Sequence, residues 1–180
     1  DNVGDAEING FELDITYLIN DVTSVTAYFN SNDPTLSEDY YGDEGVLTAN
    51  AGNRLSNMPK SSYYLSLDRD IVLMGLPGFL NIDYSFVGDR FSTFENVSSG
   101  SDIREVLPSY GLANMRLGVE MDNSIIEAYI SNIADEDGYL SRYDDFAQAG
   151  DPATSGYPGF GIRRTGTKPR VIGIRYRYRF

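Results

Sequence analysis

The chain has 180 residues, a formal net charge of −13, 14 tyrosines, 9 phenylalanines and 18 glycines, and it contains no histidine, cysteine or tryptophan. Without histidine and cysteine it has no Ser-His-Asp triad, Cys-His pair, disulfide or zinc site built on those residues. The acidic balance argues against nucleic-acid binding, because phosphate contacts need clustered Lys and Arg. No apolar run reaches the roughly 20 residues of a transmembrane helix, so a membrane role would have to use strands.

Alternation of apolar and polar residues with a period of two predicts about seven antiparallel β-strands. In "GFELDITYLI", for example, Phe11, Leu13 and Ile15 share one face, and Glu12 and Asp14 share the other. Short turns are expected after the first, third and fifth strands, the second of them being "MGLPG" at 74–78. The expected strands cover residues 10–19, 23–33, 61–73, 79–91, 109–121, 124–137 and 168–180.

Three polar stretches rich in Gly, Pro, Asn and Asp, residues 31–59, 92–108 and 138–166, are predicted to be loops. All three connect strands at one end, and the short turns connect them at the other. Transmembrane barrels show this asymmetry, and about 9 to 11 tilted residues are enough to cross the bilayer. We therefore expect an all-β fold, an antiparallel transmembrane β-barrel segment with short periplasmic turns and long extracellular loops. A soluble ligand-binding β-barrel, with the apolar faces around a core, is an alternative.

The odd number of strands is informative, because single-chain bacterial barrels have an even number and both ends in the periplasm. Counted back from the last strand, the first one also runs toward the periplasm. We therefore expect residues 1–180 to be the C-terminal part of a larger barrel. The alternative is a small complete outer-membrane barrel that serves as an anchor or adhesin. The first residues lack the basic and apolar regions of a signal peptide, which favours a mature chain, a cytoplasmic chain or a fragment.

Five stretches, in this order, resemble the TonB-dependent receptors of the Gram-negative outer membrane. They are "NVGDAEINGFELDITYL", "GNRLSNMPKSSYYLSL", "YSFVGDRF", "SNIADEDGY" and "KPRVIGIRYRYRF". The resemblance implies a 22-stranded barrel of which about the last seven strands are present, while the plug domain and the earlier strands are not. It implies active transport of a scarce nutrient, such as a ferric siderophore, a cobalamin or an oligosaccharide, with no enzymatic activity and no cofactor.

The resemblance also implies a set of partners. These are outer-membrane lipid, the protein's own plug domain and remaining barrel strands, a TonB-type energy coupler reached through the missing N-terminal region, and the barrel-assembly machinery. Nucleic acid is not among them.

The last strand supplies the first candidate site. Its aromatic residues Tyr176, Tyr178 and Phe180 share one face, and the resemblance implies that they form the signal read by the assembly machinery. The opposite face carries arginines, which would point into the lumen because an arginine facing lipid at mid-bilayer costs about 2–4 kcal/mol. There they can pair with acids of neighbouring strands or with acidic groups of a plug. These lumenal residues are Glu120, Glu127, Arg175, Arg177 and Arg179.

The predicted loops supply a second candidate site, because aromatic and Arg residues are favoured binding anchors. The alternative is that these side chains pack within the loops or form aromatic belts at the membrane interface. The loop residues are Tyr40, Tyr41, Tyr139, Tyr143, Phe146, Tyr157, Phe160, Arg163 and Arg164. The acidic runs "SEDYYGDEG" and "ADEDGY" lack the ligand spacing of a calcium loop, so no metal site is expected.

Overall fold

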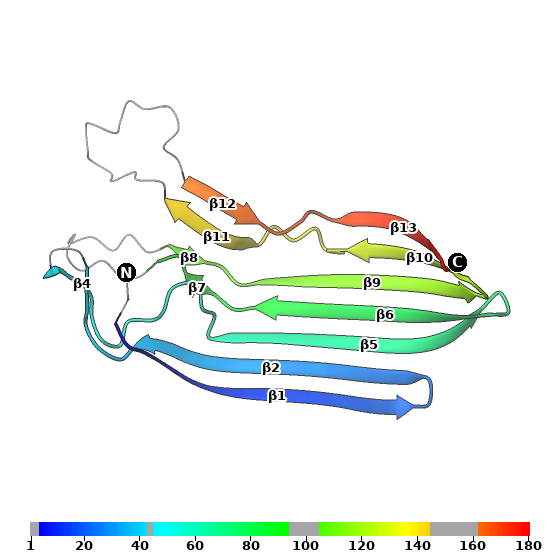
Figure 1. Cartoon of the computed structure of the whole chain (residues 1–180), viewed down its shortest axis with the longest axis horizontal. Helices are drawn as coiled ribbons and strands as arrows, with labels where there is room; N and C mark the ends of the chain where they lie inside the picture. The colour runs from blue at the N-terminus through cyan, green and yellow to red at the C-terminus, as the bar shows by residue number, and fades with distance from the viewer. Residues whose placement is uncertain (1–3, 43–44, 94–104, 145–161) are drawn as a thin grey trace, which may run out of the picture.

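Seven strands form one antiparallel sheet in the order β1-β2-β5-β6-β9-β10-β13, in a computed structural model that describes residues 4–42, 45–93, 105–144 and 162–180 (Figure 1). The number of strands and their antiparallel pairing confirm the prediction. The strands are β1 (Ala6–Asn20), β2 (Thr23–Leu36), β5 (Ser61–Leu73), β6 (Leu76–Val87), β9 (Tyr110–Met121), β10 (Ser124–Ser131) and β13 (Val171–Tyr178). No helix in the described ranges is long and apolar enough to cross a membrane.

The turns at one end of the sheet are all tight, with two residues each: Asp21–Val22, Met74–Gly75 and Asp122–Asn123. Met74 and Gly75 have φ angles of 56° and 81°, and positive φ at both central residues is typical of the hairpin turn whose twist matches the flanking strands. The turn predicted at 74–78 was therefore too long. Pro77 and Gly78 belong to β6, where they pair with Val72 and Ile71.

Some strand ends also differ from the prediction. β1 begins at Ala6 rather than at residue 10, and β2 continues through Pro34, which pairs with Ile8. β10 ends at Ser131 rather than at residue 137. The physical reason is Asn132, whose φ of 53° leaves the extended region and whose side-chain amide donates to the carbonyl oxygens of Glu136 and Lys168.

The long connections contain strands of their own, which the prediction of plain loops missed. Three two-stranded ladders lie at the end of the sheet opposite the tight turns (Figure 1). They pair β3 (Tyr40–Tyr41) with β4 (Leu47–Ala49), β7 (Arg90–Phe91) with β8 (Val106–Leu107), and β11 (Tyr139–Asp144) with β12 (Ile162–Gly166). The expected strand 79–91 is thereby divided, since β6 ends at Val87 and Arg90 begins another ladder.

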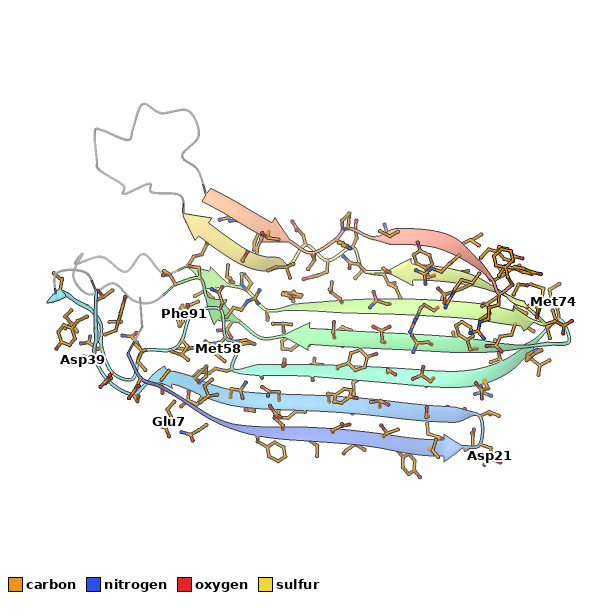
Figure 2. The ribbon with its side chains drawn as sticks, viewed as in Figure 1. Glu7, Asp21, Asp39, Met58, Met74 and Phe91 are labelled. Atoms are coloured by element: carbon orange, nitrogen blue, oxygen red, sulfur yellow. The ribbon has the colours of Figure 1, made fainter. Side chains whose placement is uncertain are left out.

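The seven strands form a single layer, and side chains are drawn along every strand of it (Figure 2). The apolar face is exposed: Phe11, Ile15, Ile82, Ile126 and Ile174 are 58%, 47%, 41%, 44% and 78% accessible. In the described residues the buried hydrophobic side chains are Leu36, Ala49 and Leu107, all at the loop end. The sheet therefore has no core in these residues, unlike the soluble alternative. β1 and β13 are its two open edges and do not pair with each other, unlike strands that close a small barrel.

Candidate functional site

The polar face of the last two strands is organised around Glu127. The ladder places Arg175 directly opposite it, with Arg175 Nη1 2.9 Å from Glu127 Oε1. Arg177 Nη2 lies 3.6 Å from the second carboxylate oxygen, Oε2. Glu127 is only 2% accessible, whereas the arginine side chains are 52% and 58% accessible. One buried carboxylate thus balances two cations that are half in solvent.

A tyrosine covers the other side of Arg175. The guanidinium carbon lies 5.4 Å from the ring centroid of Tyr129, a distance at which the ring face attracts a cation. Tyr129 pairs with Gly173 across the ladder, and a Cβ at Gly173 would lie 2.5 Å from the tyrosine hydroxyl oxygen. The glycine therefore gives the ring the space that it needs to lie against the sheet.

Glu120 and Arg179 have a different environment. Together with Arg177 they line a depression of about 240 Å³ beside the turn at Asp122–Asn123. Neither of the two makes an ion pair with a described residue, although the backbone N–H of Arg179 donates to the carbonyl of Asn123. The structure brings these predicted residues to one place but joins only Glu127, Arg175 and Arg177 by ion pairs.

A hydrogen-bonded network continues across the polar face toward β5. Arg116 donates from Nε and Nη2 to Asn81 Oδ1, at 3.1 and 2.8 Å, and Asn81 Nδ2 donates to Asp68 at 2.7 Å. In parallel, Asn114 Nδ2 donates to Asp83 at 2.7 Å. A cavity of about 300 Å³ is lined by Asp83, Asn114 and Arg116 together with Glu127 and Arg175. The residues of this network are not among the predicted site residues, although the period-two pattern places them all on the polar face.

A larger hollow of about 610 Å³ lies toward β1, β2, β5 and β6. The rings of Tyr28 and Tyr64 meet across the ladder with centroids 5.9 Å apart. Beside them Asn30 Nδ2 donates to Glu12 Oε1 at 3.0 Å, and Asp14 completes the acidic side of the hollow. The polar face is therefore acidic and tyrosine-rich over the first strands, and arginine-rich over the last.

The loop end is held together by Arg90, which is 4% accessible. Its guanidinium donates to the carbonyl oxygens of Tyr139 and Leu140 and lies 5.5 Å from the ring centroid of Tyr110. In the preceding connection, Arg54 pairs with Asp89 at 3.1 Å. The three long connections are thus linked through the start of the β7–β8 ladder.

A second ionic group, the Glu105 cluster (Glu105, Arg142 and Arg164), joins β11 and β12 to the segment before β8. Arg164 Nη2 lies 3.0 Å from Glu105 Oε1, and Arg142 Nη1 contacts Oε2. Arg164 also lies over the ring of Tyr139, 5.1 Å from its centroid. Glu105 and Arg142 were not among the predicted site residues, because no sequence pattern connects them.

The other predicted loop residues are dispersed. Tyr40 and Tyr41 lie in the separate β3–β4 ladder, and Tyr143 pairs with Arg163 in the β11–β12 ladder. Phe146, Tyr157 and Phe160 lie outside the described residues. In the described part of the chain, no group of three or more acidic side chains is placed to hold a metal ion.

Tyr176 and Tyr178 of β13 lie on the exposed apolar face, whereas Phe180 follows the end of the strand, which covers Val171–Tyr178 rather than the predicted 168–180. Tyr176 pairs with Ile126 and is 61% accessible, and the rings of Tyr178 and Phe180 meet edge to face with centroids 5.1 Å apart. These positions leave all three side chains available to a partner or to lipid.

Comparison with known proteins supports one family. The family model "TonB dependent receptor-like, beta-barrel" matches residues 1–133. No curated protein matches the chain. Among solved structures, the siderophore receptor PiuA from Acinetobacter baumannii is similar, with a TM-score of 0.70 and 17% sequence identity over 97% of this chain. The chain spans 22% of the length of PiuA. This chain belongs to the family of TonB-dependent receptors, and its seven-stranded sheet is a segment of that family's β-barrel.

Proposed function

We propose that this chain is the C-terminal wall of an outer-membrane receptor that actively takes up a scarce nutrient. A ferric siderophore is the first substrate class, since PiuA is described as a siderophore receptor. Cobalamin and an oligosaccharide are the others. The chain supplies barrel wall, extracellular loops and the C-terminal assembly signal. The plug domain, the earlier strands and the contact with a TonB-type coupler belong to other parts of the receptor.

The observation that carries the proposal is the contrast between the two faces of a single-layer sheet. One face exposes Phe11, Ile15, Ile82 and Ile174, and no described layer covers it. The other carries the ion pairs of Glu127 and the network from Asp68 to Arg116. A barrel wall requires both, because lipid surrounds one face and water fills the lumen on the other.

The aromatic residues support the same orientation. Phe11 and Phe29 meet near the loop end of the apolar face, with centroids 6.5 Å apart, whereas Tyr17 and Tyr176 lie toward the turn end. From Phe11 to Tyr17 the strand rises about 20 Å at about 3.4 Å per residue. Outer-membrane barrels have an apolar band of about 25 Å between two aromatic girdles. Because the strands of such barrels are tilted by about 35–45°, this rise spans about 15 Å of the bilayer, so both groups fall within the apolar band and support its orientation toward lipid.

Uptake by cells tests the proposal directly. Cells that express the receptor should accumulate one labelled compound among a ferric siderophore panel, cobalamin and maltooligosaccharides, and accumulation should require the TonB coupler. A coupler-deficient strain is the matched control. Accumulation of none of these compounds would contradict the transport proposal, and a monomer stable in buffer without detergent would contradict the membrane location as well.

A further inference from the structure

The β11–β12 ladder contains an unfavourable pair of like charges. Arg142 and Arg164 lie directly opposite each other in its register. Opposed like charges destabilise a two-stranded ladder, which has no further strands to hold it in place. A bound anion between the two guanidinium groups removes this repulsion.

Glu105 supplies that anion from outside the ladder. Its Oε1 lies 3.0 Å from Arg164 Nη2, and its Oε2 contacts Arg142, so each carboxylate oxygen forms an ion pair with one arginine. The backbone of Glu105 is fixed separately, since its N–H donates to Ser92 Oγ at 3.2 Å and its carbonyl accepts from the Ser92 N–H at 2.9 Å. The side chain can therefore leave the arginines while the backbone keeps its place.

Arg164 and the start of β11 have supports of their own as well. Arg90 holds the start of β11 through the carbonyls of Tyr139 and Leu140, and the Tyr139 ring lies against Arg164. Neither support uses the carboxylate of Glu105. The two cations would stay close together if Glu105 moved away, and they would then form a site for two oxygen atoms of another anion.

We propose that Arg142 and Arg164 form a binding site for a carboxylate-bearing ligand, which Glu105 occupies in the free protein and which the ligand opens by displacing it. Two guanidinium groups face the carboxylate of Glu105, one at each of its oxygen atoms, and a ligand carboxylate can take the same position. Arg164 and Glu105 are 42% and 31% accessible and Arg142 is 15% accessible, so a ligand reaches the site from the side of Arg164. This inference rests on the proposed receptor function, because the ligand arrives from outside the cell.

Citrate is a suitable probe, because it presents several carboxylates and is otherwise small. Its affinity for the purified receptor in detergent can be measured by isothermal titration calorimetry at low salt, where ion pairs are least screened. An internal group that occupies the site about 80–90% of the time lowers the apparent affinity about five- to tenfold. Glu105→Gln should therefore bind citrate about five- to tenfold more tightly than the wild type.

Arg164→Gln in the Glu105→Gln background should abolish that gain. Glu7→Gln is the matched control: it removes one negative charge from an exposed residue whose carboxylate accepts a hydrogen bond from the side chain of Asn9, and it should leave the citrate affinity unchanged. Equal citrate affinity for the wild type and Glu105→Gln would overturn the proposal, as would a gain that survives Arg164→Gln.

Glu105→Ser provides a second way to remove the carboxylate and should show the same gain. If neither Glu105 variant forms a folded barrel, the proposal is also overturned, because Glu105 is then a structural support and not a displaceable group. Binding in detergent requires no TonB coupler and no transport. A failed uptake experiment with tighter citrate binding therefore contradicts only the proposed function, and the reverse result contradicts only this site.

Discussion

Gly173 lies directly opposite Tyr129 in the ladder between β10 and β13, and the tyrosine ring occupies the space where a side chain at residue 173 would begin. The same ring lies against Arg175. A backbone position with no side chain thus determines where an aromatic ring and a cation meet on the polar face.

Gly173→Ala tests this relationship. The added Cβ would force the Tyr129 ring to move, and overpacking of this kind costs about 1–3 kcal/mol. We expect the temperature at which the purified receptor loses its heat-modifiable migration on gels to fall. Gly166→Ala is the control, because a Cβ there would only come within 3.5 Å of Asp137 Oδ1, an ordinary contact. Equal melting of both variants would show that Tyr129 adapts without cost.

Glu127→Gln should destabilise the wall more than Glu120→Gln. The first change leaves Arg175 and Arg177 without their buried carboxylate, while Glu120 makes no ion pair with a described residue. Since the arginines are about half exposed, solvent screening reduces the loss, and we expect about 1–2 kcal/mol. Unfolding in guanidinium from lipid vesicles measures it. A larger loss for Glu120→Gln would contradict this assignment.

Arg177→Ala tests a contact with the plug domain. If the arginine face of β13 holds acidic groups of the plug, removal of this half-exposed cation should make the plug more mobile in the complete receptor. A spin label on the plug, read by electron paramagnetic resonance, reports that mobility. Arg69→Ala, on strand β5, which lies away from β13 in the sheet, controls for loss of a positive charge. Unchanged mobility in Arg177→Ala would count against plug contact.

Arg90→Lys should loosen the start of β11 although the charge is kept. Lysine lacks the planar fork that reaches the carbonyls of Tyr139 and Leu140. Loss of buried hydrogen bonds costs about 1–3 kcal/mol, and each 1.4 kcal/mol is about tenfold in an equilibrium constant. Hydrogen exchange of amides in Tyr139–Asp144 should accelerate about tenfold or more. Lys60→Ala, which removes an exposed ion pair with Asp33, should have no effect there.

Phe180→Ala should lower the amount of folded receptor in the outer membrane several-fold without changing the stability of the molecules that do fold. The reason is that Phe180 is fully exposed and, among the aromatic rings of the described residues, contacts only Tyr178, so its removal costs little packing. Quantitative gels of membrane fractions measure the folded amount. Tyr17→Ala, another exposed aromatic on the apolar face, is the control, and an equal decrease would argue against a dedicated C-terminal signal.

The period-two pattern predicted the strands of the barrel wall well, because the alternation within a single strand shows which of its side chains share a face. It placed Glu127 and Arg175 on one face, and the two-residue turn at Asp122–Asn123 sets the register between β9 and β10. It made the turn at Met74 too long, because Pro and Gly are common in turns, although Pro77 and Gly78 here pair within the ladder.

The loop ladders and the Glu105 cluster were beyond prediction for a different reason. Glu105 and Arg164 are 59 residues apart in the sequence. The contact between them depends on how two long connections fold and on the hydrogen bonds from Arg90 to β11. Neither produces a pattern in the local sequence. The hydrogen bonds from Arg116 to Asn81 could not be predicted for the same reason, because they depend on the register between β6 and β9, which a long connection joins.

The two ends of the sheet differ in how much change they can accept. Because each turn has two residues, one inserted residue next to Met74 or Asp122 would exchange the lipid and lumen faces of the strand that follows it. At the other end an insertion lengthens a connection at little entropic cost. Related receptors can therefore vary what they present outside the cell while keeping the same barrel.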